Sequence, residues 1–488
     1  MPSRVLLVSV PAPSVRQKKV EKDFWYWHYA LKARLTYPHL KTSQLRLLGE
    51  SENQNVGLLS IASALEANGF KVDYLAPSLA FGDDRRILNF EHCLQVMVAR
   101  DRYDFVGFSA HTCAIPLAKE FAQIVKVWRP EITTLLGGPH ATGSTGQELE
   151  DLLDAFDYVV RGKGEIPFLR LIQRQNDTPG ISFRHGDRHS VTEPCFASPE
   201  HYPSPANHLM NIKELPAARV FTSLGCRKGK KCVFCADGMH TRTFITRPIE
   251  DVVAEMIWFY QHLGTRYFYL GDENLLLDQI HAQAVFDGLR QLPDDIVIGC
   301  QARIESANEK LISALARTGK CTEIQYGIEN ADQEVLNLNR KGLRIKQVRK
   351  VCGLTKPLGI RVHCYFLVGL PGETSKTAEL TIEMMEQMLQ EGNADFVEYR
   401  SVIPFPGAPM WEEAERYGIH LRHKRWEKYR GENVPPFDLD NLTAREIHRY
   451  YLEGLRRITV QYKSRYLREF GSTVPDVNVL SSINEGSF

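Results

Sequence analysis

The alternation of short β-branched runs with helical patterns is the feature that most limits how this chain of 488 residues can fold. In the first 180 residues, strands are predicted at 4–10, 70–75, 103–110, 132–138 and 156–162, with helices between them. Strands that alternate with helices pair in parallel, and the helices cover both faces of the sheet. Residues 1–180 therefore predict a doubly wound, five-stranded parallel sheet.

Ligands of such a sheet bind beyond the carboxyl ends of the strands. This rule places the segments 109–113, 137–143 and 161–165 in one crevice, which is the expected binding site of the first domain. About 45 residues separate the first strand from its helix, which is long for a loop without structure of its own. They include an aromatic, basic tract at 15–35. This tract could cover a planar ligand with Trp25, Tyr26, Trp27 and Tyr29, or it could pack into the core.

The alternation resumes after a polar, proline-containing linker at 181–215, which contains one candidate hairpin. Six strands are predicted at 217–225, 266–272, 297–302, 323–329, 361–370 and 396–404. Six β/α units are too few for a closed eight-unit barrel, so residues 216–404 predict a partial (β/α)6 barrel. Residues 405–488 are charged and helical, with an amphipathic helix at 443–467. The fold class is therefore α/β with a C-terminal helical region.

The charge balance and the apolar runs limit where the protein works. Lys and Arg number 60 and Asp and Glu number 59, so no overall basic field attracts nucleic acid or an anionic membrane. No apolar run approaches the roughly 18 residues that span a bilayer, and the first residues do not fit a signal peptide. Ten cysteines scattered over the chain do not resemble a secreted disulfide framework. We therefore expect a cytoplasmic protein.

Three cysteines cluster in the segment SLGCRKGKKCVFCADG, directly after the first strand of the predicted barrel. Cys226, Cys232 and Cys235 are separated by five residues and then by two. Zinc would accept three thiolates and one imidazole, and His240 follows closely. An iron–sulfur cluster held by three thiolates, with its fourth iron open to another ligand, is the second interpretation. The strand-end position favours the second, because active sites of β/α barrels collect there.

This loop resembles the cluster-binding loop of radical S-adenosylmethionine (SAM) enzymes, with Phe234 as the aromatic residue before the last cysteine. Its first gap, filled by RKGKK, is two residues longer than the usual pattern. The resemblance implies a 4Fe–4S cluster on the three cysteines, SAM on the open iron, and a 5'-deoxyadenosyl radical that abstracts hydrogen from substrate. It also implies an external one-electron donor such as flavodoxin or ferredoxin.

Later segments resemble the same family at consecutive strand ends. The family resemblance assigns them to SAM binding, and the residues concerned are Phe234, Gly271, Asp272, Glu273, Arg303, Glu329, Gly369 and Pro371. Gly271, Asp272 and Glu273 would approach the amino group of the methionine part, and Glu329 would bind the ribose or the methionine end. The FLVGLPGET segment at 366–374 would back the adenine.

The first domain is similar to the cobalamin-binding domain that precedes the radical domain in one large subfamily. The motif that supplies a histidine to cobalt there, Asp-x-His-x-x-Gly, is absent from this sequence. The resemblance therefore implies cobalamin without a protein histidine on cobalt, with Ser109, Thr112, Gly137 and Gly138 lining its nucleotide tail.

The expected function is radical chemistry on a small, natural-product-like molecule, with C-methylation as the leading reaction. The first alternative keeps the fold and leaves cobalamin out, so that the radical drives dehydration, epimerisation or rearrangement, for instance of a sugar or aminoglycoside intermediate. The second is RNA modification, which is disfavoured because the chain has no basic RNA-binding tail and no second set of cluster cysteines. The residues that contact substrate or transfer protons are not predicted by the sequence.

Overall fold

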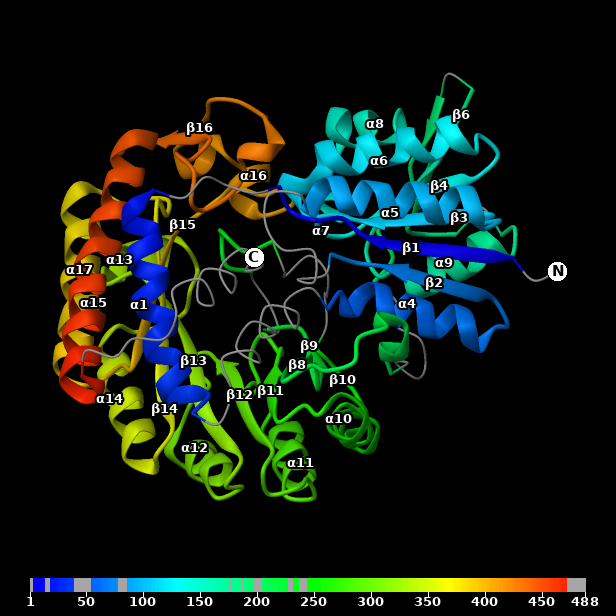
Figure 1. Ribbon diagram of the computed structural model, residues 1–488. Coiled ribbons are helices and arrows are strands. Elements are labelled where there is room, and N and C mark those ends of the chain that lie inside the picture. Colours follow the sequence, from blue (N-terminus) through cyan, green and yellow to red (C-terminus); the bar gives the residue numbers. More distant parts are fainter. Residues whose placement is uncertain are drawn as a thin grey trace.

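The fold was analysed in a computed structural model that describes residues 3–13, 18–38, 54–77, 86–175, 178–186, 188–196, 204–226, 231–236 and 244–471. It has two lobes, each built around one main sheet (Figure 1). His240 and most of the RKGKK gap lie outside the described residues.

The N-terminal lobe contains a seven-stranded sheet in the order β2-β1-β3-β4-β5-β6-β7. Its elements are β1 (Arg4–Ser9), α4 (Val56–Ala67), β2 (Lys71–Leu75), α5 (Arg86–Arg100), β3 (Phe105–Ser109), η1 (Thr112–Ala114), α6 (Ile115–Trp128), β4 (Thr133–Gly137), α7 (Pro139–Gly143), α8 (Gly146–Leu153), β5 (Tyr158–Val160), α9 (Glu165–Ile172), β6 (Ile181–His185) and β7 (Arg188–Ser190). The five predicted strands are β1 to β5, and they pair in parallel. Apolar residues on both faces of this sheet form two core clusters.

The sheet differs from the predicted one at its edge. The predicted hairpin, which we had placed in the linker, forms β6 and β7 and adds two antiparallel strands beside β5. Gly180, with φ +90°, redirects the chain into β6, and its N–H donates to the carbonyl of Glu193. The sheet is therefore mixed rather than purely parallel, and β5 is an internal strand.

The second lobe is a partial barrel of six parallel strands in the order β15-β14-β13-β12-β11-β8. Its elements are η2 (Asn207–Met210), β8 (Ala217–Val220), β9 (Ser223–Leu224), β10 (Ile245–Thr246), α10 (Ile249–Leu263), β11 (Tyr267–Leu270), α11 (Gln279–Leu289), β12 (Val297–Ala302), α12 (Glu309–Ala316), β13 (Cys321–Glu329), α13 (Gln333–Leu338), α14 (Lys346–Thr355), η4 (Lys356–Leu358), β14 (Arg361–Val368), α15 (Ser375–Gln390) and β15 (Phe396–Ser401). The six predicted barrel strands match these six, and the α/β class is confirmed.

The C-terminal region contains α16 (Pro409–Glu412), η5 (Glu415–Tyr417), β16 (Ile419–Leu421), η6 (Trp426–Lys428), β17 (Phe437–Leu439) and the long helix α17 (Ala444–Phe470). A capping box between Thr443 and Glu446 starts α17. Its buried face packs on α15 and on β15, the edge strand of the barrel. No helix within the described part of the chain is both long enough and apolar enough to cross a bilayer.

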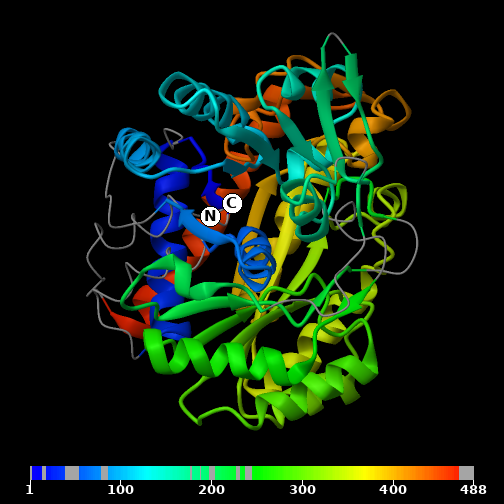
Figure 2. The same ribbon diagram turned by 90° about the vertical axis from the view of Figure 1, so that its right-hand side faces the viewer.

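The aromatic tract forms α1 (Lys19–Thr36), which belongs in space to the barrel although it lies between two elements of the first lobe in sequence. It runs along α17 at the open side of the barrel, as Figures 1 and 2 show. Trp25 is only 3% exposed and packs in the barrel core, and the guanidinium of Arg400 lies 4.4 Å from its ring centroid. Tyr26, Trp27 and Tyr29 pack against the same core. Of the two predicted alternatives, packing into the core is the one observed.

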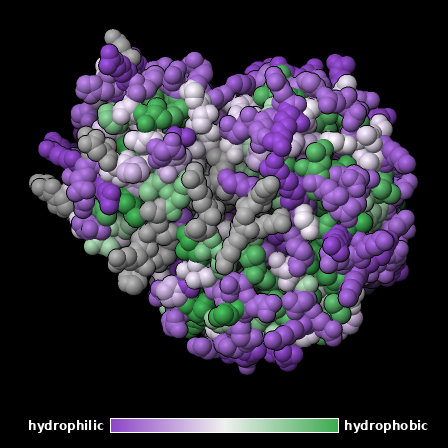
Figure 3. Space-filling model, turned by 180° about the vertical axis from the view of Figure 1, so that it is seen from behind, coloured by the Kyte–Doolittle hydropathy of each residue, from purple (hydrophilic) through white to green (hydrophobic). Residues whose placement is uncertain are grey.

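The carboxyl ends of both main sheets face the space between the lobes (Figure 1). The C-terminal region returns across this space to the first lobe. The carbonyl of Pro406 lies 2.1 Å from where a side chain on Gly143 would begin, so this approach requires a glycine. Arg430 donates to the carbonyl of Pro13 at 2.7 Å. The face of the molecule opposite to the one in Figure 1 is mostly hydrophilic where its residues are described (Figure 3).

Candidate active site between the two lobes

The start of the cysteine loop is held by a buried carboxylate at the end of β11. Asp272 is fully buried and accepts hydrogen bonds from the backbone N–H and hydroxyl of Thr222 and from the hydroxyl of Ser223. Glu273 accepts from the N–H of Gly225 at 2.8 Å. The two residues expected to meet the methionine amino group thus fix the segment just before Cys226. Their direct contact with SAM stays a prediction.

Two of the three cysteine thiols converge on one guanidinium. Nη1 of Arg303 lies 3.7 Å from Sγ of Cys226 and 3.5 Å from Sγ of Cys232. Arg303 is 6% exposed, and its Nη2 donates to the carbonyl of Lys341. Burial raises the pKa of the Cys226 thiol, while the charge of Arg303 acts in the opposite direction. A buried cation is therefore in place to stabilise the thiolate forms that ligate a metal.

The third cysteine follows within one turn. The N–H of Cys235 donates to the carbonyl of Cys232 at 3.2 Å, which curls the chain around that residue. The intervening Val233 exchanges backbone hydrogen bonds with two distant segments, through the carbonyl of Asn339 and the N–H of Met410. Phe234 is partly buried against the barrel core. The described half of the loop is thus anchored on both sides by backbone hydrogen bonds.

A buried ion pair lies at the carboxyl end of β13. Oε1 of Glu329 is 2.6 Å from Nζ of Lys341, and the two side chains are 10% and 6% exposed. Burial opposes the charge of Lys341, but Glu329 raises its pKa overall. Glu329 has φ +72°, which is rare for a residue with a side chain and points to a functional constraint. Gly327 is needed here, because a Cβ would lie 2.6 Å from Oε1 of Glu329.

The glycine segment after β14 is braced by a second buried carboxyl. Gly369 has φ +89°, and its N–H donates to Glu373 at 2.5 Å. Asn330 donates to the other oxygen of Glu373 at 2.6 Å. Burial raises the pKa of Glu373 to about 7. The carbonyl of Pro371 accepts from Asn339 at 2.9 Å, so the predicted adenine-side residues are tied to the segment that also holds the cysteine loop.

Gly271 lies at the end of β11, next to β8. A Cβ there would meet the ring of Phe221 at 2.7 Å. The packing of β11 on the segment after β8 therefore requires a residue without a side chain, and Gly271 is held by its N–H to the carbonyl of Val220.

The four residues predicted to line the cobalamin tail come together at the carboxyl ends of β3 and β4. Ser109 and Gly137 are direct partners in the sheet. Gly138 has φ +98°, and a Cβ there would lie 3.1 Å from Oγ of Ser109. Oγ1 of Thr112 lies 3.2 Å from Nδ1 of His140. These positions form a backbone cradle at the crevice of the sheet.

The two strand-end regions interact across the space between the lobes. Lys163, which follows β5, is buried, and burial lowers its pKa against the smaller opposing effects of Glu165 and Glu273. From the C-terminal region, the ring of Trp426 packs edge-on against His140 at a centroid distance of 4.8 Å. Burial lowers the pKa of His140 to about 3, so its ring is neutral. The predicted cobalamin side and the predicted SAM side therefore face one common interior.

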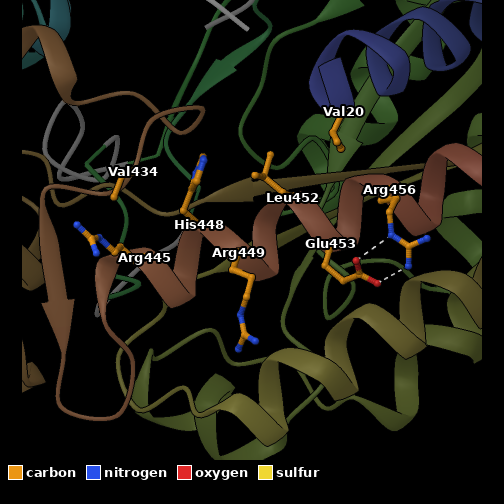
Figure 4. A pocket seen from close by; sticks show the side chains of 8 residues that line it. All are labelled: Val20, Val434, Arg445, His448, Arg449, Leu452, Glu453 and Arg456. Carbon is orange, nitrogen blue, oxygen red and sulfur yellow. Dashed lines mark hydrogen bonds and ion pairs between the residues drawn. The ribbon is translucent and has the colours of Figure 1, made fainter. Parts of the chain in front are cut away.

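A separate groove of about 460 Å³ lies along α17, between that helix and the start of α1 (Figure 4). Its lining residues are Val20, Val434, Arg445, His448, Arg449, Leu452, Glu453 and Arg456. None of the predicted site residues is among them, so this groove is distinct from the strand-end site.

Sequence reasoning missed the residues that support the site. Lys341 and Asn339 lie in the segment after α13, away from any strand end, and Glu373 was quoted only as part of a turn motif. Asn274 also escaped notice. Its side chain accepts from the N–H of Arg303 at 3.1 Å and donates to Ser306 at 2.9 Å. One signal in the sequence could have indicated Lys341. It is a lysine in the short connection between two predicted helices, and the fold buries this connection.

Comparison with known families agrees with this arrangement. The B12 binding domain family matches residues 49–172, and the Radical SAM superfamily matches residues 220–385. An uncharacterized methyltransferase, PH0819 of Pyrococcus horikoshii, is 26% identical over 90% of this chain and 93% of its own length. The cytidylyl-2-hydroxyethylphosphonate methyltransferase of Streptomyces wedmorensis is 24% identical over 75% of this chain and 78% of its own.

Among solved structures, the radical SAM methyltransferase TsrM of Kitasatospora setae has the same fold. Its complex with tryptophan and a SAM analogue gives a TM-score of 0.62 at 17% identity, over 86% of this chain and 77% of TsrM. Its complex with cobalamin and a 4Fe–4S cluster gives 0.61 at 18% identity, with the same coverage.

The fold and the site define a class of protein: a parallel β/α barrel with a three-cysteine loop, joined to a B12-type sheet. The chain belongs to the radical SAM superfamily, in the group with an N-terminal B12-binding domain. It is a cobalamin-dependent radical SAM enzyme, and its two matched domains imply a 4Fe–4S cluster, SAM and cobalamin as cofactors.

The residues present fit these cofactors. Two thiols within reach of Arg303, with the third one turn away, are the donor set of a cluster that leaves one iron open. The cradle at Gly137 and Gly138 lies where a doubly wound sheet binds a ligand. The individual SAM and cobalamin contacts remain predictions.

Proposed function

We propose that this enzyme methylates an unactivated carbon of a small molecule. The observation that carries the proposal is that the carboxyl ends of both main sheets face the space between the lobes, and that the lobes are joined there by a hydrogen bond of 3.1 Å from the N–H of Arg219 on β8 to the side chain of Gln54. A methyl donor on the first lobe and a radical source on the second would then share one interior. The methyltransferase relatives support the same reaction.

When bound, the cofactors supply a 5'-deoxyadenosyl radical for hydrogen abstraction and a methyl group for transfer. The substrate would lose one hydrogen atom, which ends in 5'-deoxyadenosine, and would gain a methyl group from the cobalamin. A second SAM would then restore the methyl group of the cobalamin and leave as S-adenosylhomocysteine. An external one-electron donor, of the flavodoxin or ferredoxin class, supplies the electrons.

The protein residues have three tasks in this scheme. Cys226, Cys232 and Cys235 hold the metal, and Arg303 places a positive charge beside the sulfurs. Glu329 is held by Lys341 in a fixed position to accept hydrogen bonds from SAM. The contact of the C-terminal region with the first lobe excludes water from the shared interior.

The test is anaerobic production with cobalamin supplied, followed by cluster reconstitution and mass spectrometry of the bound corrinoid. With reductant and SAM carrying a deuterated methyl group, we expect about one S-adenosylhomocysteine per corrinoid and the label on the corrinoid. With a substrate, S-adenosylhomocysteine and 5'-deoxyadenosine should form in equal amounts. Formation of 5'-deoxyadenosine with neither bound corrinoid nor S-adenosylhomocysteine would refute methylation and favour dehydration, epimerisation or rearrangement.

The charge balance favours a small-molecule substrate. The near-equal numbers of acidic and basic residues provide no overall field to attract RNA. The relative TsrM was solved with tryptophan bound, which is a small molecule. Competition of bulk RNA for turnover would contradict this part of the proposal.

A further inference from the structure

A second group of residues with metal-ligand side chains lies away from the cysteines, on α1, β14 and β15. His28 comes from α1, His363 is the third residue of β14, and Glu398 is the third residue of β15. All three are buried, and one potential ligand atom from each lies within 4.8 Å of the others. Gln325, the register partner of His363 on β13, lies four residues before Glu329, which is roughly 13 Å along a strand. This group is therefore separate from the cluster site.

Three of the four imidazole nitrogens of this group are buried without a hydrogen-bond partner. Nδ1 of His28 and both ring nitrogens of His363 are buried and unpaired, and the two residues are 2% and 1% exposed. Nε2 of His363 lies 3.8 Å from Glu398, which is too long for a hydrogen bond. Buried polar atoms without a partner are costly, and a bound ion is one of the few ways to satisfy them.

The separations suit an ion. Bonds of about 2.0–2.2 Å from zinc to nitrogen and oxygen place tetrahedral ligand atoms roughly 3.3 Å apart. The three ligand atoms would therefore need to approach one another by about 1.5 Å at most, which side-chain torsions can provide.

The charged and polar groups around these residues are placed like those that orient metal ligands. Nδ1 of His363 faces Glu323 at 3.6 Å, and Glu323 is itself held by Gln325 at 3.0 Å and by Lys32 at 3.4 Å. Oε1 of Glu398 accepts from Arg400 at 2.8 Å, which leaves Oε2 directed toward His363. A carboxylate behind a ligating histidine, and a donor behind a ligating carboxylate, are the usual outer partners of a metal site.

We propose that His28, His363 and Glu398 bind a divalent transition-metal ion, for which two imidazoles and one carboxylate favour zinc, and that this ion fastens α1 to β14 and β15. Because the ion would join α1 to two barrel strands, it would stabilise the barrel without taking part in the radical reaction. The competing explanation is a water molecule hydrogen-bonded among the same groups.

The test counts zinc and iron separately in the reconstituted holoenzyme by plasma mass spectrometry, after incubation with zinc and desalting. We expect one zinc per chain in addition to the cluster iron. His28→Gln and His363→Gln should lose the zinc and keep the iron, while a triple serine variant of Cys226, Cys232 and Cys235 should lose the iron and keep the zinc. His140→Gln, at a buried histidine of the other lobe, is the matched control and should keep both.

Zinc that is absent from the wild type, or that is lost with the cysteines and kept by the histidine variants, would overturn the proposal. If the histidine variants do not fold, Co²⁺ added to the triple serine variant gives a second readout. Its visible absorption should appear in that background, and Glu398→Gln should change or abolish it. Identical cobalt spectra with and without Glu398→Gln, or no bound cobalt at all, would equally overturn the site.

Discussion

Replacement of Glu329 by glutamine tests whether the buried ion pair is part of the SAM site or only of the barrel. Glu329 and Lys341 are 2.6 Å apart, and both side chains are at least nine-tenths buried. Loss of the carboxylate would leave the ammonium of Lys341 buried beside Arg303 without its partner. Since burial disfavours its charge, the pKa of Lys341 should fall in this variant.

The expected loss of stability follows from that burial. Removal of one partner of a buried pair costs about 3–5 kcal/mol, whereas an exposed pair contributes 1 kcal/mol or less. A loss of about 3–5 kcal/mol lowers the folding equilibrium of the barrel by more than 100-fold. Replacement of both partners, as Glu329→Gln with Lys341→Met, should recover most of this loss, because no unpaired charge remains.

Urea unfolding of the apo-proteins would measure stability, and equilibrium dialysis with SAM and the yield of 5'-deoxyadenosine would measure function. We expect the double variant to unfold near the wild-type midpoint and still fail to bind SAM. If the double variant binds SAM like the wild type, Glu329 is not a cofactor ligand. A single variant that loses less than 1 kcal/mol would show that water screens this pair, contrary to its burial.

Three further predictions concern the same region. Cys232→Ala should abolish 5'-deoxyadenosine formation and lower the iron content, and retained formation would contradict the cluster assignment. Arg303→Met should keep the iron but make the cluster potential more negative and slow 5'-deoxyadenosine formation roughly 10–100-fold, because a donor to the sulfurs is lost; an unchanged potential in an electron paramagnetic resonance titration would contradict this. Glu373 has a folded-state pKa of about 7, above the value of 4.5 for an exposed glutamate. It therefore stabilises the fold below about pH 4.5, and this contribution of about 3 kcal/mol is lost as the pH rises to 7. Glu373→Gln should remove that part of the pH dependence in denaturant titrations from pH 5 to 8, and identical pH profiles of the variant and the wild type would refute it.

Periodicity was sufficient to predict the main strands, because a β/α chain alternates between two clearly different patterns. The five strands of the first sheet and the six of the barrel were found in this way. The pairing of β6 with β5 was not, since a hairpin has the same local pattern whether it joins a sheet or stands in a linker. The position of α1 was also left open, because aromatic residues at helical spacing suit a ligand cover and a core equally well.

The site was predicted where a motif joins neighbouring residues, as in the cysteine loop. It was not predicted where distant segments meet. The family resemblance assigned Asp272, which follows β11, to SAM binding. Only the structure shows its three hydrogen bonds to Thr222 and Ser223. Lys341 and the group of His28, His363 and Glu398 come from segments that no local pattern connects.

The place of α1 has a consequence for how the chain is made. A ribosome makes residues 19–36 long before residues 444–470, and these two helices lie against each other beside the barrel. The packing of α1 therefore cannot be completed until residues 444–470 have been made, although domains generally fold in order as they emerge. Until α17 is synthesised, more than 400 residues after α1, the side chains of Phe24 and Trp25 on α1 lack this packing partner. If the lobes were expressed as two separate polypeptides, neither would be complete. The N-terminal polypeptide would contain α1, which packs on α17 of the C-terminal polypeptide.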